Sequence, residues 1–150
     1  MSTVNRVRTF LTSSGSLVLI VLVGAVVFSQ CDARHKDVSH DPQYASRVGQ
    51  ACTVLKGLRA HGLTRDLRTK ATLEVAVTTL PGIDGPEITF KTPIPKGTVF
   101  RVTSVRECWN CPFDRISYGV SVPTIPELAA HNTFARPEAL EPTEAECNRP

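Results

Sequence analysis

The chain has 150 residues, 41% of them hydrophobic and 21% charged, which suits one packed domain plus a targeting segment. The formal net charge is +3, but Arg6 and Arg8 precede the first acidic residue, so residues 31–150 carry 15 basic and 14 acidic side chains, a net charge of +1. A nearly neutral domain lacks the strong basic patch of nucleic-acid-binding proteins, which excludes that class.

The first predicted element is an N-terminal hydrophobic helix within residues 1–30. Arg6 and Arg8 precede an uncharged stretch over 9–30, whose densest part, 17–28, is an apolar run of 12 residues. Basic residues before such a run are typical of a signal peptide, and the stretch is also long enough for a membrane anchor. Either interpretation places the rest of the chain outside the cytoplasm, on the periplasmic or extracytoplasmic side.

The residues before Cys31 resemble the lipobox of bacterial lipoproteins, in which an apolar residue and two small residues precede the lipidated cysteine. Here the order is Val27-Phe28-Ser29-Gln30-Cys31, and Phe28 and Gln30 depart from that pattern. Three outcomes stay open: an uncleaved anchor, a lipoprotein lipidated at Cys31, and a secreted domain released by cleavage.

Residues 31–47 are polar and charged, and predict a tether to a β domain over 48–123. In that domain Gly/Pro-rich turns separate runs that alternate or are β-branched, which indicates strands. The intervening segment 57–67 contains two glycines and is expected to be a loop with at most one helical turn. The predicted fold class is mainly β, a small antiparallel barrel or sandwich of about five strands, with strands expected at residues 52–56, 71–80, 87–91, 98–106 and 116–122.

The C-terminal segment differs in composition, because residues 123–150 contain five prolines and five glutamates. We expect a surface-hugging or disordered tail over 124–150, with one short helix starting near Thr124 as its N-cap. Cys147 argues against full disorder, since a cysteine so near the end is most useful as a clamp.

Residues 93–102 read Pro-Ile-Pro-Lys-Gly-Thr-Val-Phe-Arg-Val. This stretch resembles the pattern apolar-x-Lys-Gly-Thr-apolar-x-Val that begins a strand in bacterial SH3-type domains. The resemblance covers about ten residues and implies a five-stranded small barrel in a bacterial envelope protein, of a kind that binds peptides or cell-wall fragments. It is too short to assign binding residues.

The chain has five cysteines, and an exported chain sits where disulfides form and persist. If Cys31 is lipidated or lies at the membrane surface, Cys52, Cys108, Cys111 and Cys147 remain as disulfide candidates, with three possible connectivities. A bridge from Cys52 to Cys108 or Cys111 would contribute about 4 kcal/mol and a local Cys108–Cys111 bridge about 2 kcal/mol. The sequence alone does not choose between them.

The motif over 107–114, Glu-Cys-Trp-Asn-Cys-Pro-Phe-Asp, contains the C-x-x-C pair. Redox catalysis would need a helix opening at the cysteines, and zinc would need a second close pair of ligands, and the sequence offers neither. We interpret the motif as a hairpin loop closed by a disulfide. Trp109 and Phe113 are possible partner-binding residues. We expect Trp109 to fold back onto the end of the barrel, with an exposed binding handle as the alternative.

No motif for catalysis, cofactor binding or metal binding is recognised: Gly-x-Ser-x-Gly, His-Glu-x-x-His and phosphate-binding glycine loops do not occur. The leading hypothesis is a non-enzymatic binding or structural module of the cell envelope, held at the membrane by its N-terminal segment, with an envelope protein or the cell wall as partner. The alternative is a thiol-dependent or hydrolytic envelope enzyme.

Overall fold

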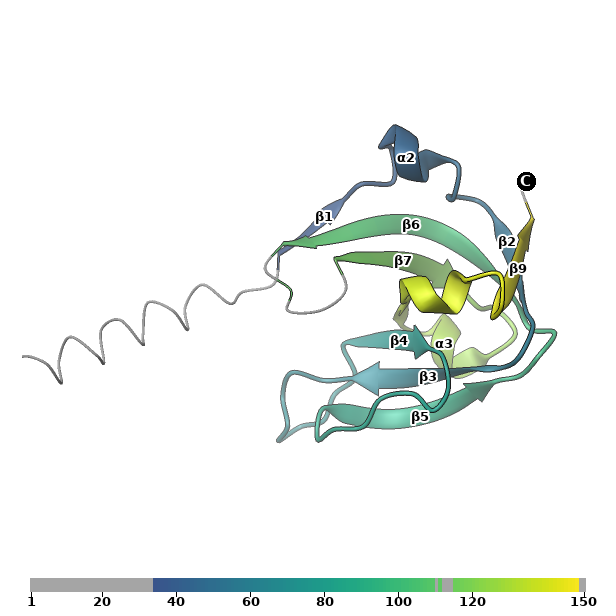
Figure 1. Ribbon diagram of the computed structural model, residues 1–150. Coiled ribbons are helices and arrows are strands. Elements are labelled where there is room, and N and C mark those ends of the chain that lie inside the picture. The colour runs from purple at the N-terminus through teal and green to yellow at the C-terminus, as the bar shows by residue number, and fades with distance from the viewer. Residues whose placement is uncertain (1–33, 110, 112–114, 149–150) are drawn as a thin grey trace, which may run out of the picture. The chain divides into compact units, whose positions relative to one another are not determined.

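The computed structural model describes residues 34–109, 111 and 115–148. These residues form nine strands and three short helices (Figure 1). The strands are β1 (Arg34–Asp37), β2 (Ala51–Val54), β3 (Leu58–Leu63), β4 (Glu74–Thr78), β5 (Ile88–Ile94), β6 (Val99–Trp109), β7 (Ile116–Ser121), β8 (Asn132–Ala135) and β9 (Ala145–Asn148). The helices are α2 (Pro42–Ala45), α3 (Pro126–Ala129) and the 3-10 helix η1 (Pro137–Leu140).

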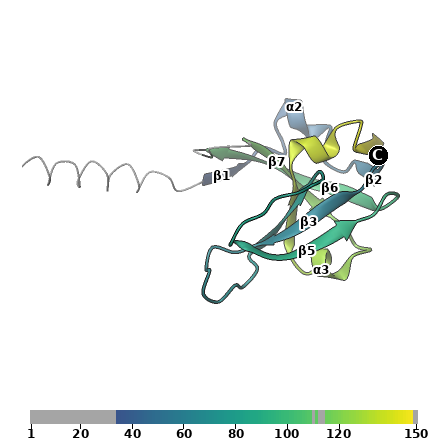
Figure 2. The same ribbon diagram turned by 60° about the horizontal axis from the view of Figure 1, so that its bottom comes forward.

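All nine strands belong to one sheet with the order β5-β3-β4-β8-β7-β6-β2-β9. The long strand β6 pairs on one edge with both β2 and β1, which follow each other along its length. Every pair is antiparallel except β4–β8, which is parallel. The sheet curves strongly but its outer strands, β5 and β9, do not pair, so it remains open (Figures 1 and 2).

Side chains alternate along each strand, so the sheet has two faces of different character. The inward face carries one hydrophobic core, to which α3 and η1 contribute. Leu58 of β3 shares this core with Ala145 of β9, although the two strands lie far apart in the strand order. The sheet therefore curls around a single core. Its buried members are Cys52, Val54, Leu58, Ala60, Val75, Val77, Ile94, Phe100, Val102, Val120, Val122, Leu128, Ala135, Ala139, Leu140 and Ala145.

The outward face mixes polar and apolar residues, and one line of residues crosses six of its strands. Each residue in this line is the register partner of the next, from β6 through β7, β8, β4 and β3 to β5. We call it the outer row, and its members are Ser104, Gly119, Phe134, Ala76, His61 and Lys91. Loop 79–87, which joins β4 to β5, covers part of this row.

The prediction of a mainly β chain is confirmed, although the described residues hold nine strands where about five were expected. The five expected strands correspond to β2, β4, β5, β6 and β7. The predicted loop over 57–67 is wrong, because most of it forms β3. Gly62 does not break this strand. It lies where the side chains of Thr89 and Phe90 occupy the space that a Cβ would take, and so marks a close approach.

The other additional strands lie in segments expected to be irregular. In the predicted tether, Arg34–Asp37 form β1, which pairs with β6 through its backbone. Its four side chains are all exposed, so the sequence shows no alternation of apolar residues that would have predicted this strand. The predicted tail contains α3, β8, η1 and β9. Its helix begins at Pro126, with Ile125 rather than Thr124 at the N-cap position.

The predicted N-terminal helix over 1–30 and the lipidation candidate Cys31 lie outside the described residues. In the part of the chain that the structure describes, no helix has the length and apolar character needed to span a membrane.

Candidate functional site

A polar groove of about 410 Å³ opens on the outward face where β7 and β8 separate. The ladder between these strands consists of two register pairs, Tyr118↔Ala135 and Gly119↔Phe134. Residues 120–122 and 131–133 would continue the ladder, but they line the groove instead. The hydroxyl of Thr133 donates to the Leu128 carbonyl at 3.0 Å. This hydrogen bond joins β8 to α3 rather than to β7.

The floor of this β7–β8 groove is formed by small side chains from β6 and β7. Gly119 faces Ser104 across the strand pair, and a Cβ at position 119 would collide with the Ser104 hydroxyl. A glycine inside a strand often marks such a close approach. Together with Ser121, Ser104 gives the floor hydroxyl groups and little bulk. A ligand can therefore come close to the backbone.

Arg106 supplies the positive charge of the groove. Its guanidinium lies 3.7 Å from a carboxylate oxygen of Glu74 and 5.0 Å from the ring centre of Phe134. These contacts fix the plane of the guanidinium. The Nε atom of Arg106 is buried and has no hydrogen-bond partner within the described residues. A buried donor without an acceptor is unfavourable by about 1–3 kcal/mol, and a small shift of the side chain toward an acceptor oxygen in the groove would remove that penalty.

Further polar side chains of the groove lie on the β8 side. Asn132 and His131 line it, and the His131 ring lies 6.2 Å from the ring of Phe90. Guanidinium, hydroxyl, amide and imidazole groups can hydrogen-bond to hydroxyls and carboxylates. Among the described residues that line the groove, none carries a carboxylate or a thiol. The groove therefore presents hydrogen-bonding groups suited to a polar ligand.

His61, also in the outer row, is fully buried beneath the β4–β5 loop. Its Nε2 atom accepts the backbone N–H of Ile83 at 3.4 Å and lies 3.2 Å from the Thr78 hydroxyl. Gly82 passes directly over the ring with a φ of 94°, a conformation that favours glycine. Burial lowers the pKa of His61, and the charges of Lys91 and Arg59 lower it further. The neutral ring therefore anchors the loop.

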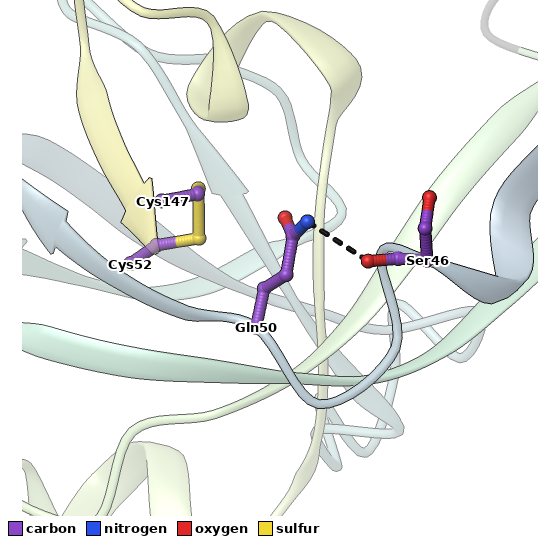
Figure 3. The surroundings of a disulfide bond; sticks show 4 residues. All are labelled: Ser46, Gln50, Cys52 and Cys147. Atoms are coloured by element: carbon purple, nitrogen blue, oxygen red, sulfur yellow. Dashed lines mark hydrogen bonds between the residues drawn. A yellow bond between two sulfur atoms is a disulfide. The ribbon is translucent and has the colours of Figure 1, made fainter. Parts of the chain in front are cut away.

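The structure selects one of the three connectivities that the sequence left open. Cys52 joins Cys147, its register partner on β9, across a sequence separation of 95 residues (Figure 3). Cys108 joins Cys111 at the end of β6, with 5.7 Å between the two Cα atoms. No bridge links Cys52 to Cys108 or Cys111, because Cys147 lies opposite Cys52 in a strand that was expected to belong to the tail. Within the described residues there is no cluster of three or more His, Cys, Asp or Glu that could hold a metal.

Beside the long-range bridge, the side-chain amide of Gln50 donates to the Ser46 carbonyl at 2.8 Å (Figure 3). This contact connects the start of β2 to the turn that follows α2. The bridge and the amide together fix the path of the chain from α2 into the sheet.

Trp109 differs from the expected position, because 65% of its surface is exposed rather than folded back onto the domain. It ends β6 and pairs in register with Arg34, the first residue of β1. The other candidate of this hairpin, Phe113, lies outside the described residues. Trp109 therefore stands apart from the β7–β8 groove, and the two aromatic candidates form no described site with it.

The groove residues were not identified from the sequence. Gly119 inside the predicted strand over 116–122 was the one available signal, because such a glycine indicates a bulge or a close approach. Arg106 and Glu74 meet only through the pairing of β4 with β8 and of β8 with β7, which the sequence does not reveal. Comparison with known proteins adds no relative: no family, no curated protein and no solved structure matches this chain.

Proposed function

We propose that this chain is a non-enzymatic binding module of the cell envelope, held at the membrane by its N-terminal segment, and that the β7–β8 groove is its ligand site. The observation that carries the proposal is the buried, unpartnered Nε of Arg106 in a groove lined by hydroxyl and amide groups. Such a donor is suited to an acceptor oxygen that the domain itself does not supply.

The ligand that fits best is a soluble cell-wall glycopeptide fragment. Such fragments carry sugar hydroxyls and peptide carboxylates, which suit the donors of the groove. The resemblance of residues 93–102 to SH3-type domains points to the same class of ligand. In the structure this stretch spans the turn from β5 into β6, where Gly97 has a φ of 86°.

The cysteines support a binding module in an oxidising compartment. Cys52, Cys108, Cys111 and Cys147 all lie in disulfides. A thiol-dependent enzyme would need one of its cysteines reduced. Alkylation of the non-reduced protein, read by mass spectrometry, distinguishes the two functions: the binding module leaves these four cysteines unmodified, whereas a labelled Cys108 would favour the enzyme. The same spectrum identifies the mature N-terminus and any lipid on Cys31.

The groove is tested by titrating purified cell-wall glycopeptide fragments into the full chain and measuring affinity by calorimetry. Arg106→Gln removes the guanidinium, and we expect affinity to fall about tenfold or more, because a charge-assisted hydrogen bond is lost. Arg101→Gln is the matched control. Arg101 lies on the same strand and the same face but bonds to the Gly49 carbonyl outside the groove. Equal affinities of the two variants, or no binding by the native chain, would contradict the groove as the ligand site.

A further inference from the structure

Trp109 lies beside the point where the described domain begins. β1 runs antiparallel to the last four residues of β6, and this register places Arg34 opposite Trp109. Val99, at the other end of β6, is ten residues away along an extended strand, a distance of about 33 Å. The exposed aromatic ring therefore lies at the end of the sheet where the preceding chain enters the domain.

Chain length sets how far Trp109 can lie from the predicted membrane segment. The uncharged stretch ends at Gln30, and Arg34 follows four residues later. Four extended residues reach at most about 14 Å, and the Cα atoms of antiparallel register partners lie about 5 Å apart. Trp109 is thus confined to within about 20 Å of the end of the apolar stretch, whatever the orientation of the domain.

The surroundings of Trp109 suit a lipid headgroup layer. Indole rings favour this layer because one side of the ring is apolar and its N–H can hydrogen-bond. Arg34 and Lys36 of β1 are exposed. Arg115, the residue before β7, has a side chain that is 74% exposed. Glu107, the register partner of Lys36, also lies 3.8 Å from Arg115, so three cations share one carboxylate here and the excess positive charge suits anionic headgroups.

We propose that Trp109, flanked by Arg34 and Lys36, inserts into the headgroup layer of the same bilayer that holds the N-terminal segment. This docking rests on the proposed membrane tether and adds a second contact to it. Two contacts at one end of β6 orient the domain, so that the Val99 end points away from the lipid.

The test uses the full chain in liposomes of phosphatidylethanolamine and phosphatidylglycerol, because Trp109 is the only tryptophan of the protein. Flotation first measures membrane attachment. Lipids brominated near the headgroup or deep in the acyl chain then quench the indole fluorescence according to its depth. We expect a blue-shifted emission that the shallow bromines quench strongly and the deep bromines weakly.

Two variants control for position and charge. In Trp109→Phe combined with Val99→Trp, the only indole moves to the far end of the same strand, and we expect its emission to be insensitive to brominated lipid. Val99 is already 48% exposed, so the change should not disturb the core. Arg34→Gln with Lys36→Gln should weaken the quenching of Trp109 on anionic liposomes.

The outcomes separate the docking from the tether. A chain that floats with the liposomes while Trp109 stays unquenched retains the tether and overturns the docking. Equal quenching of the indoles at positions 99 and 109 also overturns it, since the domain would then have no preferred orientation. A chain that does not float overturns the tether, and the docking with it.

Discussion

The inward and outward faces of the sheet share a backbone but are stabilised in different ways. Inward, Val75 and Ile94 belong to one continuous apolar core, and the Cys52–Cys147 bridge closes that core at its edge. Outward, His61 and Arg106 are each held by a few directional contacts, and each keeps one ring or guanidinium nitrogen without a partner in the described domain. The inward face should therefore determine stability, and the outward face should respond to single substitutions, pH and ligand.

The largest expected effect on the free energy of unfolding comes from removing the Cys52–Cys147 disulfide at the edge of the core. Replacing Cys52 and Cys147 together by Ala should lower the free energy of unfolding by about 4.5 kcal/mol, because the bridge closes a loop of nearly one hundred residues. Denaturant titration of the oxidised protein measures this loss. The matched control is the double replacement of Cys108 and Cys111 by Ala, which should lower the free energy of unfolding by about 2 kcal/mol. Equal losses would contradict the assignment of the long-range bridge to the core.

A medium effect is expected on the outward face at Gly119. Gly119→Ala brings a methyl group against the Ser104 hydroxyl and should destabilise the domain by about 1–3 kcal/mol, since Ser104 and Thr103 must shift to make room for it. Adding Ser104→Ala should recover part of this loss. A double-mutant cycle on the free energies of unfolding gives the coupling. If the two substitutions are simply additive, the contact between these two residues is not the cause.

The smallest expected effect is a pH dependence from His61. Its pKa in the folded chain is lowered from 6.5, so the unfolded chain takes up a proton first as the pH falls. Stability should be complete above pH 6.5 and decrease below it until the folded ring also protonates. Asp37, Asp66 and Asp84 have pKa values lowered from 3.8, so they affect stability only at more acidic pH. Denaturation midpoints between pH 7.5 and about 4.5 measure the slope.

Two substitutions test whether this slope belongs to His61. His61→Gln should remove it, while also destabilising the domain at neutral pH through the lost contact with Ile83. Lys91→Ala removes a nearby positive charge, so the pKa of His61 should rise toward its ordinary value and the loss at acidic pH should shrink. An unchanged slope in His61→Gln would assign the pH dependence to other groups.

Sequence reasoning succeeded where one strand carries its own signal. Ile116–Ser121 alternates apolar and small polar residues because one side faces the core, and the strand could be read without knowing its neighbours. β1 could not be predicted in this way, because all its side chains are exposed and it is held by the pairing of its backbone with β6. The four-residue strands β8 and β9 are too short to show a period.

The candidate site was harder to predict than the fold, because it depends on pairings between distant segments. Arg106 meets Glu74 only after β8 inserts in parallel beside β4 and antiparallel beside β7. The role of Cys147 as a clamp was a sound prediction from its position, but its partner was not deducible, since strand register decides which thiol it faces. The role of a single residue could thus be predicted from the sequence, whereas the residues that it meets in space could not.

If the chain is exported as proposed, the order in which the thiols emerge gives the two bridges different roles. A chain threaded from its N-terminus would present Cys52 to an oxidising compartment long before Cys147, with Cys108 and Cys111 arriving in between as competing partners. Their mutual bridge spans three positions, so it closes the shortest loop once both cysteines are out. Once Cys108 and Cys111 are bridged to each other, neither thiol can pair with Cys52. Among the described cysteines only Cys147 is then left for Cys52, so the last disulfide to form has one possible partner.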